Sequence, residues 1–333
     1  MRPTISVIIV TYNGRQLLEP CLRALFAGSR LPDEVIVVDN ASRDDTVGWL
    51  ANAHPLVRID RCATNLGFAV ANNRAIRASA GTYLLTLNND TEMTPDALAN
   101  MVSVLDEAGP MVGAVMPVLV FAESPEVIAC AGLETFTNGV VRDARVGQPI
   151  GIDHEPYPIF GPSAGAALYR REALDDVALF DPAFFMYLED ADLAWRLRLR
   201  RWATVAVPNA IVPHKVSATA TYGSPRKAYY LARNRWWCLL KNLPAPLLRR
   251  HVGDLARYDA AAVTYATLTG DRASLIGRRD AMRDLSTILR ARAMIQSRVT
   301  APVEEIASWL LPSPPLVATV RERRLIHALI GKH

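Results

Sequence analysis

Short, largely apolar runs alternate with segments of helical spacing over the first 120 residues, and this alternation constrains the fold more than any other feature. The runs are rich in β-branched residues, which is typical of parallel strands buried on both faces. Strands are expected at residues 5–10, 34–39, 57–60, 83–87 and 112–120, and helices at 15–27, 44–53, 67–80 and 94–107. Thr94 is expected to cap the last helix, with Pro95 in its first turn. This order predicts an α/β fold with a mostly parallel central sheet covered on both faces.

The rest of the chain divides into a mixed part and a helical part. Residues 121–160 are irregular and rich in turns, and strands are expected at 164–169 and 204–207, with His214 in a loop. After Pro225 only helical patterns remain, at 226–242, 246–268, 272–296, 302–311 and 316–330. We therefore expect a catalytic or binding domain over residues 1–242 and a helical C-terminal region over 243–333.

Composition narrows the class of protein. A chain of 333 residues fits one large domain with an appendage, or two domains. It has no run of eighteen apolar residues, so no transmembrane helix is expected, and the N-terminus is typical of a first strand and not of a signal peptide. The four cysteines have no CxxC spacing, which favours a reducing, cytoplasmic location over a disulfide framework or a structural zinc site.

Charge is distributed unevenly. Residues 1–225 carry 18 basic and 25 acidic side chains, a net charge of −7, whereas residues 226–333 carry 19 and 8, a net charge of +11. A basic tail of this kind suits an anionic surface, either membrane headgroups or nucleic acid, or else it packs onto the acidic body.

Polar residues follow four of the predicted strands. They are Thr11-Tyr12-Asn13-Gly14, Asp39-Asn40-Ala41-Ser42, Asn65-Leu66-Gly67-Phe68 and Asn88-Asn89-Asp90-Thr91. Ligands of open parallel sheets bind at the carboxyl ends of the strands, so these side chains are expected to share one crevice. Each Asn or Asp taken alone is also an ordinary turn residue.

These residue types suit a nucleotide and a cation. Asp39 can accept hydrogen bonds from a base imide or a ribose hydroxyl, and Asp90 can hold a divalent cation that neutralises a diphosphate. The chain has neither a GxGxxG nor a GxxxxGK[ST] phosphate loop. A diphosphate bound here would therefore need a metal ion or basic side chains.

The segment FFMYLEDADLAWRLRLRR, residues 184–201, brings three acids directly after an apolar run. Acids favour the first turn of a helix, so Glu189, Asp190 and Asp192 can be explained as ordinary helix design, with Asp192 pairing Arg196 one turn on. Desolvating a carboxylate is costly, however, so acids that follow an apolar lead-in are also candidates for a general base.

These segments together resemble the family 2 glycosyltransferases of the GT-A fold, and most closely the bacterial branch that includes rhamnosyltransferases. The matching segments span roughly residues 4–242 and occur in the family's order: SVIIVTYNG (6–14), VVDNASRDDT (37–46), NLGFAVANN (65–73), LLTLNNDT (84–91), GPSAGAALYRRE (161–172), LFDPAFFMYLEDADLAWRLR (179–198) and YLARNRWWCLLK (230–241). Any one of them would be weak evidence, but their order and spacing are specific.

The resemblance implies inverting transfer of a sugar from a UDP-, dTDP- or GDP-linked donor to the hydroxyl of a saccharide, lipid-linked or small-molecule acceptor, in cell-surface polysaccharide or glycolipid biosynthesis. It implies Asp190 as general base, and Asp90 with His214 as ligands of Mg²⁺ or Mn²⁺. It also implies contacts to donor or acceptor from a wider set of side chains: Thr11, Tyr12, Asn13, Asp39, Asn40, Asn65, Gly67, Phe68, Asn88, Asn89, Glu189 and Arg233. We expect burial and the charges of Glu189 and Asp192 to raise the pKa of Asp190.

Two departures from the family pattern stand out. Asn88 replaces the first acid of a full Asp-x-Asp, which leaves metal dependence open, and Leu179 replaces the usual glycine before Phe180-Asp181. A nucleotidyltransferase or a non-catalytic nucleotide-sugar-binding protein remain alternatives. The first lacks the expected glycine-rich basic loop after strand one, and the second would not need both Asp90 and Asp190.

The basic tail matches no motif. Its arginine clusters, Arg249-Arg250, Arg278-Arg279 and Arg321 with Arg323-Arg324, suit peripheral contact with anionic lipid, and equally a helical cap or a homo-oligomer interface. With lipid-linked acceptors in view, a nucleic-acid partner is not expected.

Overall fold

The computed structural model describes residues 2–215, 224–314 and 329. The predicted helix over 316–330 lies outside the described residues apart from Leu329, and so do the arginines at 321–324.

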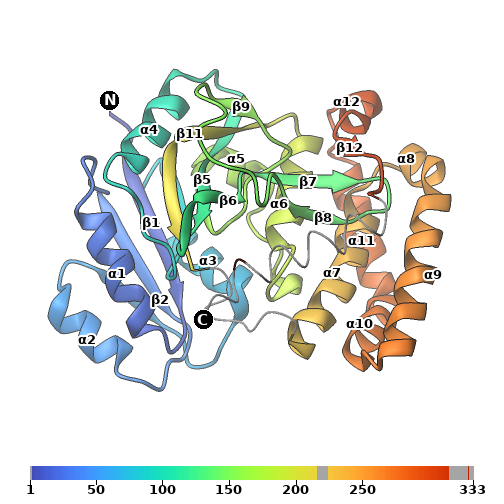
Figure 1. Ribbon diagram of the computed structural model, residues 1–333, viewed down its shortest axis with the longest axis horizontal. Coiled ribbons are helices and arrows are strands. Elements are labelled where there is room, and N and C mark those ends of the chain that lie inside the picture. Colours follow the sequence, from blue (N-terminus) through green and yellow to red (C-terminus); the bar gives the residue numbers. More distant parts are fainter. Residues whose placement is uncertain (1, 216–223, 315–328, 330–333) are drawn as a thin grey trace.

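The first 121 residues form the predicted alternation of strands and helices (Figure 1). The strands are β1 (Ile5–Thr11), β2 (Glu34–Asp39), β3 (Arg58–Arg61), β4 (Tyr83–Asn88) and β5 (Val112–Phe121). The helices are α1 (Arg15–Phe26), α2 (Thr46–Ala53), α3 (Gly67–Ala78) and α4 (Ala97–Glu107). Strands β3, β2, β1 and β4 are neighbours in that order and all parallel. Their carboxyl ends therefore lie along one edge of the sheet.

The sheet changes direction beyond β4. Its order continues β10-β5-β11-β9, and β10 (Ala166–Arg170) runs antiparallel to both β4 and β5. Strand β11 (Ala203–His214) is parallel to β5, while β9 (Tyr157–Pro158) and β6 (Ser124–Cys130) pair antiparallel with β11 and β5. The register of β11 shifts between Val207 and Ile211, and the strand then continues to His214 opposite Phe121. The prediction that His214 lies in a loop is therefore wrong, because pairing with β5 extends this strand.

Two apolar layers cover the sheet, as predicted. Val7 and Ile9 face α1, α2 and α4, whereas Ile8 faces the opposite layer, which contains α3, α5 (Arg171–Asp176) and α6 (Glu189–Leu199). Successive strand residues point to opposite faces, so a continuous apolar run supplies both layers.

Helix α4 begins later than predicted. Its first residue is Ala97, and the preceding Thr94 donates its hydroxyl to the carbonyl oxygen of Ile211 at 2.8 Å. Thr94 therefore ties α4 to β11 and does not cap the helix, because a tertiary partner takes the hydroxyl.

The remaining helices gather at the end of the molecule opposite α1 and α2 (Figure 1). They are α7 (Pro225–Asn242), α8 (Ala245–Arg250), α9 (Val252–Thr269), α10 (Arg272–Arg283), α11 (Leu285–Gln296) and α12 (Val303–Ala307). A third apolar cluster joins them to α6 and includes Trp195, Trp237 and Ile288. Helix α7 packs against α6, α10 and α11. The expected boundary after residue 242 thus falls at the end of a helix that contacts both parts of the chain, and it stays a prediction.

Three helix predictions in this region are wrong in extent. The segments 246–268 and 272–296 are each broken in two, at His251 (φ −108°, ψ 12°) and at Asp284 (φ −86°, ψ 8°). Neither position carries the glycine or proline that marks a break in sequence. The third segment stops at Ala307, and β12 (Leu310–Leu311) joins a small second sheet with β7 (Leu133–Phe136) and β8 (Val141–Asp143).

Among the helices in the described ranges, none combines the length and apolarity needed to cross a membrane. The four cysteines are all free and buried.

Candidate active site

The strand ends meet as predicted at the carboxyl edge of the sheet. Thr11 and Asp39 are direct neighbours in the parallel pairing of β1 with β2, and both are buried. Asn89, just after β4, donates from Nδ2 to Thr11 Oγ1 at 3.0 Å. Asp39 accepts the Ser42 N–H at 3.2 Å. Three of the four strand ends therefore supply polar side chains to one place.

Gly14 makes this close approach possible. A Cβ atom at residue 14 would lie 2.5 Å from Asn89 Nδ2 and 2.6 Å from Thr11 Oγ1. A side chain here would therefore displace the hydrogen bond between Asn89 and Thr11.

The loop after β1 is tied to the loop after β2. Asn13 has a left-handed backbone (φ 48°), donates its N–H to Ser42 Oγ at 2.8 Å and accepts the Arg43 N–H at 2.7 Å. The adjacent Tyr12 is 39% exposed. Of these two predicted nucleotide contacts, only Tyr12 has a side chain that is open and not engaged by the chain itself.

Asn40 and Asn65 are engaged with each other. Asn40 Nδ2 donates to Asn65 Oδ1 at 3.1 Å, and Asn40 Oδ1 accepts the Leu66 N–H at 2.8 Å. Asn65 Oδ1 also accepts the Gly67 N–H at 2.9 Å. These amides shape the loop that leads into α3, and Gly67 and Phe68 lie against Phe185. Their assignment as direct nucleotide contacts stays a prediction.

Asp90 lies beside His214. The distance from Asp90 Oδ1 to His214 Nε2 is 3.2 Å, and the Lys215 N–H donates to the Asp90 carbonyl at 2.9 Å. Asp90 Oδ1 is buried and accepts no hydrogen bond. A buried carboxylate oxygen without a donor, next to an imidazole nitrogen, fits a divalent cation. The described residues offer no group of three or more His, Cys, Asp or Glu ligands, so a cation here would take further oxygen ligands from substrate, water or neutral groups of the chain.

Asp190 lies in the first turn of α6, close to these strand ends. Its carboxylate accepts the N–H of Ala191 at 2.8 Å and of Ala164 at 3.3 Å. The next residue, Gly165, accepts the Asn88 N–H at 2.8 Å. The segment 164–165 therefore joins Asp190 to the end of β4, next to Asp90.

The three acids of α6 have different environments. Burial raises the pKa of Asp190, and the charge of Asp143 raises it further. Burial and the charge of Asp190 raise the pKa of Glu189, whose buried Oε2 has no hydrogen-bond partner. Burial would also raise the pKa of Asp192, but Lys241 and Arg196 outweigh it and lower that pKa.

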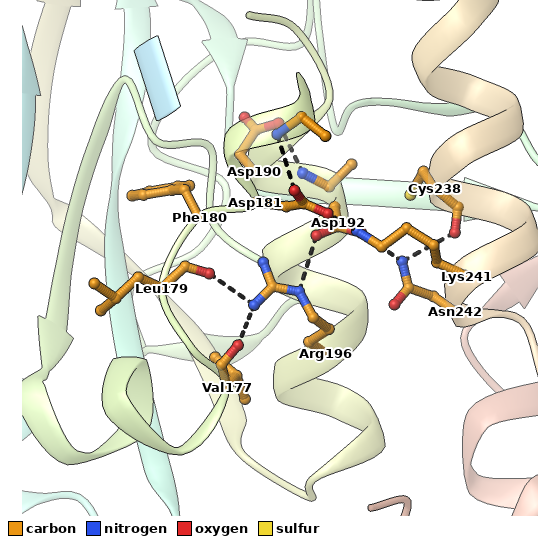
Figure 2. Close-up of polar contacts among 12 residues, drawn as sticks. Val177, Leu179, Phe180, Asp181, Asp190, Asp192, Arg196, Cys238, Lys241 and Asn242 are labelled. Atoms are coloured by element: carbon orange, nitrogen blue, oxygen red, sulfur yellow. Dashed lines mark hydrogen bonds and ion pairs between the residues drawn. The ribbon is translucent and has the colours of Figure 1, made fainter. Parts of the chain in front are cut away.

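Asp192 is therefore part of a charge network and does not act on Asp190 as expected. Figure 2 shows Arg196 and Lys241 on either side of it. Arg196 Nε donates to Asp192 at 2.8 Å, which confirms the predicted pair, and Lys241 Nζ lies 2.8 Å from the other carboxylate oxygen. Lys241 also pairs with Asp181, and Asn242 donates to Asp192 at 2.8 Å.

Arg233 lies on α7 and its guanidinium is engaged with the chain. It donates to the carbonyl oxygens of Ala183 and Phe184 at 2.6 and 3.2 Å. Both of these bonds come from Nη2, and the predicted contact of Arg233 with donor or acceptor stays a prediction.

Sequence reasoning missed Asp143 and Lys241. Asp143 lies on β8 in the turn-rich region, where no pattern marked it. Lys241 lies in the family-like segment YLARNRWWCLLK, and its burial, which distinguishes it from a surface lysine of a helix, comes from the fold and has no signal in the sequence.

Comparison with known proteins identifies the family. Residues 6–178, more than half of the chain, match the family described as "Glycosyl transferase family 2". The chain belongs to this family and is a glycosyltransferase, which decides against the two alternatives considered from sequence. One relative is an N-acetylglucosaminyl-diphospho-decaprenol L-rhamnosyltransferase of Mycobacterium tuberculosis, 29% identical over 247 residues that cover 66% of this chain and 78% of the relative. The sequence is thus rhamnosyltransferase-like.

Solved structures show the same GT-A fold. A mannosyltransferase from Pyrobaculum calidifontis in complex with GDP-Man and Mn²⁺ has a TM-score of 0.53 at 21% identity, covering 100% of this chain and 89% of the other. TarS of S. aureus in complex with UDP-GlcNAc has a TM-score of 0.55 at 16% identity, covering 89% and 84%. Both of these structures contain a nucleotide sugar, and the mannosyltransferase structure also contains Mn²⁺.

Proposed function

We propose that the protein transfers a hexose, with inversion, from a nucleotide diphosphate sugar to a hydroxyl of a saccharide carried on a lipid diphosphate, in cell-surface polysaccharide synthesis. The name of the rhamnosyltransferase relative gives N-acetylglucosaminyl-diphospho-decaprenol as acceptor, and this supports a lipid-diphosphate-linked saccharide as the class of acceptor here. The observation that carries the mechanism is Asp190, a carboxylate held by main-chain N–H groups beside the polar strand ends.

Inversion needs one base. The acceptor hydroxyl proton passes to the Asp190 carboxylate while the acceptor oxygen bonds to the anomeric carbon. The bond from that carbon to the diphosphate oxygen breaks on the opposite face, and the nucleoside diphosphate leaves. The raised pKa of Asp190 makes it a stronger base than an ordinary carboxylate. Mg²⁺ or Mn²⁺ at Asp90 and His214 would neutralise the charge that builds on the diphosphate.

Donor identity is the first experiment. The purified protein is screened for thermal stabilisation by UDP-, dTDP- and GDP-linked sugars, each with and without Mn²⁺. Stabilisation by one nucleotide class supports the proposal and selects the donor used in the tests below. If no nucleotide sugar stabilises the protein, the proposed donor class is wrong.

Asp190→Asn tests the base. The substitution keeps the shape of the side chain but removes the proton acceptor, so we expect turnover to fall by at least about 100-fold, the lower range for a general base. Nucleotide affinity, measured by calorimetry, should stay near that of the wild type. Asp175→Asn, an exposed change on α5, is the matched control and should keep full turnover. Substantial turnover by Asp190→Asn would remove it as the base.

Asp90→Ala tests the cation site. The loss of the Asp90 carboxylate, whose buried Oδ1 lies beside His214 and accepts no hydrogen bond, should weaken binding of the donor diphosphate and blunt the response of turnover to Mn²⁺. Titration of the nucleotide at several Mn²⁺ concentrations measures both effects. Glu92→Ala, an exposed acid two residues away, is the control. An unchanged Mn²⁺ response in Asp90→Ala would place the cation elsewhere.

A further inference from the structure

The four residues before α6, 185–188, have an unusual backbone; we call them the strained loop. Phe185, Tyr187 and Leu188 have φ values of 62°, 66° and 64°, and none is glycine. The left-handed region is unfavourable for residues with a Cβ atom, and such residues persist only where the surroundings hold them. Leu188 directly precedes α6, so its conformation sets the direction in which Glu189 and Asp190 leave the loop.

Helix α7 holds one side of the strained loop through Asn234. This side chain is fully buried, and its Nδ2 lies 3.1, 2.9 and 2.7 Å from the carbonyl oxygens of Phe184, Met186 and Tyr187. An amide nitrogen has two hydrogens, so three carbonyls share them. One side chain thereby fixes the peptide group that precedes Phe185 and the peptide groups on both sides of Tyr187.

Arg233 adds a second contact from the same helix. Its bonds to the carbonyls of Ala183 and Phe184 fix the residues that enter the strained loop. The guanidinium also lies 5.2 and 5.3 Å from the ring centres of Tyr230 and Trp237, which keep it in place.

Helix α3 holds the other side. The carbonyl oxygen of Phe185 accepts the Phe68 N–H at 2.6 Å. A Cβ atom at Gly67 would lie 2.5 Å from that oxygen, so glycine lets the two segments meet. The strained loop is therefore held between the strand-end region through α3 and the C-terminal helices through α7.

We propose that Asn234 is a positioning residue for catalysis: it holds the strained loop in its left-handed conformation and so aims Asp190 at the acceptor. The role of Asp190 as base comes from the proposed function, on which this inference rests. Asn234 touches no reacting atom. Its effect passes through the carbonyls of the strained loop into the first turn of α6.

Asn234→Ala is the test, and Gln296→Ala is its matched control. Gln296 also donates a side-chain amide to two carbonyls of the chain, those of Lys241 and Asn242, at the far end of α7. Hydrogen–deuterium exchange of the ligand-free enzyme should speed up in residues 184–192 for Asn234→Ala and not for Gln296→Ala. With the donor selected by the screen, kcat should fall roughly 100-fold in Asn234→Ala, the loss expected for a misplaced catalytic group. The Kd of the nucleotide should change by less than about twofold, because Asn234 does not lie in the donor site.

Rescue separates positioning from general stability. Glycine adopts the left-handed region without penalty, so Leu188→Gly in the Asn234→Ala background should recover part of the lost kcat. Equal kcat in Asn234→Ala and in the double variant would mean that Asn234 does not act by holding Leu188 in the left-handed conformation. That result would overturn the proposal.

The failure of this inference and the failure of the proposed base are distinguishable. If residues 184–192 exchange in Asn234→Ala as in the wild type, Asn234 does not hold the loop, whatever Asp190 does. If exchange speeds up but kcat is unchanged, the loop does not position catalysis. If exchange speeds up, kcat falls and Asp190→Asn still turns over, the positioning role stands and the base is another residue.

Discussion

At the scale of single residues, three acids within four positions acquire three different properties from their surroundings. Asp192 sits between two cations and is held charged, whereas Glu189 is buried with an unpartnered oxygen and favours its proton. Asp190 lies between these extremes, with main-chain donors and a raised pKa. The sequence around these acids cannot predict which of the three stays charged. One of the two cations that pair with Asp192, Lys241, comes from α7, about fifty residues later in the chain.

The raised pKa of Glu189 predicts a pH-dependent cost of folding. The folded state binds this proton more tightly than the unfolded state, so stability falls as pH rises between the ordinary glutamate pKa and the raised one. Glu189→Gln should therefore stabilise the protein more at pH 8.5 than at pH 5, by at least about 1 kcal/mol, the worth of roughly one pKa unit. Urea unfolding at both pH values measures the difference.

Glu126→Gln is the control for this prediction, since Glu126 is exposed. It should change stability by the same small amount at both pH values. The same gain for Glu189→Gln at both pH values would contradict the assigned environment of Glu189.

Sequence reasoning named most of the residues at the site and misjudged what several of them touch. Thr11, Asp39, Asn89 and Asp90 could be placed because strand ends converge in any parallel sheet. The sequence could predict that Asn40 and Asn65 lie at the strand ends, but not what their side chains bind. An amide can hydrogen-bond a ligand or a neighbouring loop equally well, and here the two amides bond each other. Which of the two occurs depends on distances between loops that are set only by the fold.

At the scale of elements, the predicted strands and helices of the first half are confirmed within a few residues because their apolar runs are continuous. The errors lie where a tertiary partner decides the end of an element. Pairing with β5 extends β11 to His214, and Thr94 is drawn to Ile211. The breaks at His251 and Asp284 likewise have no local signal.

Gly67 allows an element-scale prediction about how α3 meets the strained loop. Alanine at this position would carry a left-handed φ of 77° and place its Cβ 2.5 Å from the Phe185 carbonyl oxygen. Gly67→Ala should cost at least about 1–2 kcal/mol, the penalty for the backbone conformation alone. It should also speed up hydrogen–deuterium exchange in residues 184–192.

Gly48→Ala is the matched control, because Gly48 lies inside α2 and a Cβ there meets nothing within 4 Å. It should stabilise the protein by about 0.5–1 kcal/mol. Glycine-to-alanine substitution is thus expected to destabilise the protein at residue 67 and to stabilise it at residue 48. Stabilisation at both positions, or destabilisation at both, would contradict the packing described at Gly67.

At the scale of the whole molecule, the C-terminal helices are part of the scaffold of the site. Lys241, with a side chain only 2% exposed, joins the last turn of α7 to both Asp181 and Asp192. The basic composition of the tail suggested a surface feature, yet this lysine is buried because two aspartates of the sheet-containing part neutralise it. Composition predicts the net charge of a segment but not which of its charges turn inward.

Lys241→Ala should therefore be costly. It leaves Asp181 and Asp192 with one cation fewer, and breaking a buried pair in this way typically costs about 3–5 kcal/mol. The lowered pKa of Asp192 depends on Lys241, so the loss should shrink as pH falls far enough to protonate that acid. Urea unfolding at pH 7 and at pH 3, which is below the ordinary aspartate pKa of about 3.9, measures both effects.

Lys215→Ala is the comparison, since its pair with Glu92 leaves more than a third of each side chain exposed. An exposed pair contributes about 0–1 kcal/mol. Similar losses in the two variants would show that the Lys241 network contributes no more than a surface pair.

The contacts that Asn234 and Lys241 make from α7 also have a consequence for synthesis on the ribosome. Chains fold as they emerge, N-terminal parts first, and strands β1 to β5 with their helices end at Phe121, long before Asn234 and Lys241 are made. A nascent chain that stops short of these two residues has the strand ends and the contact from α3 to Phe185, but it lacks the contacts from α7 to residues 184–188. If Asn234 positions Asp190 as proposed, competence for sugar transfer arrives only when α7 has been made, and a prematurely terminated chain would bind donor without consuming it.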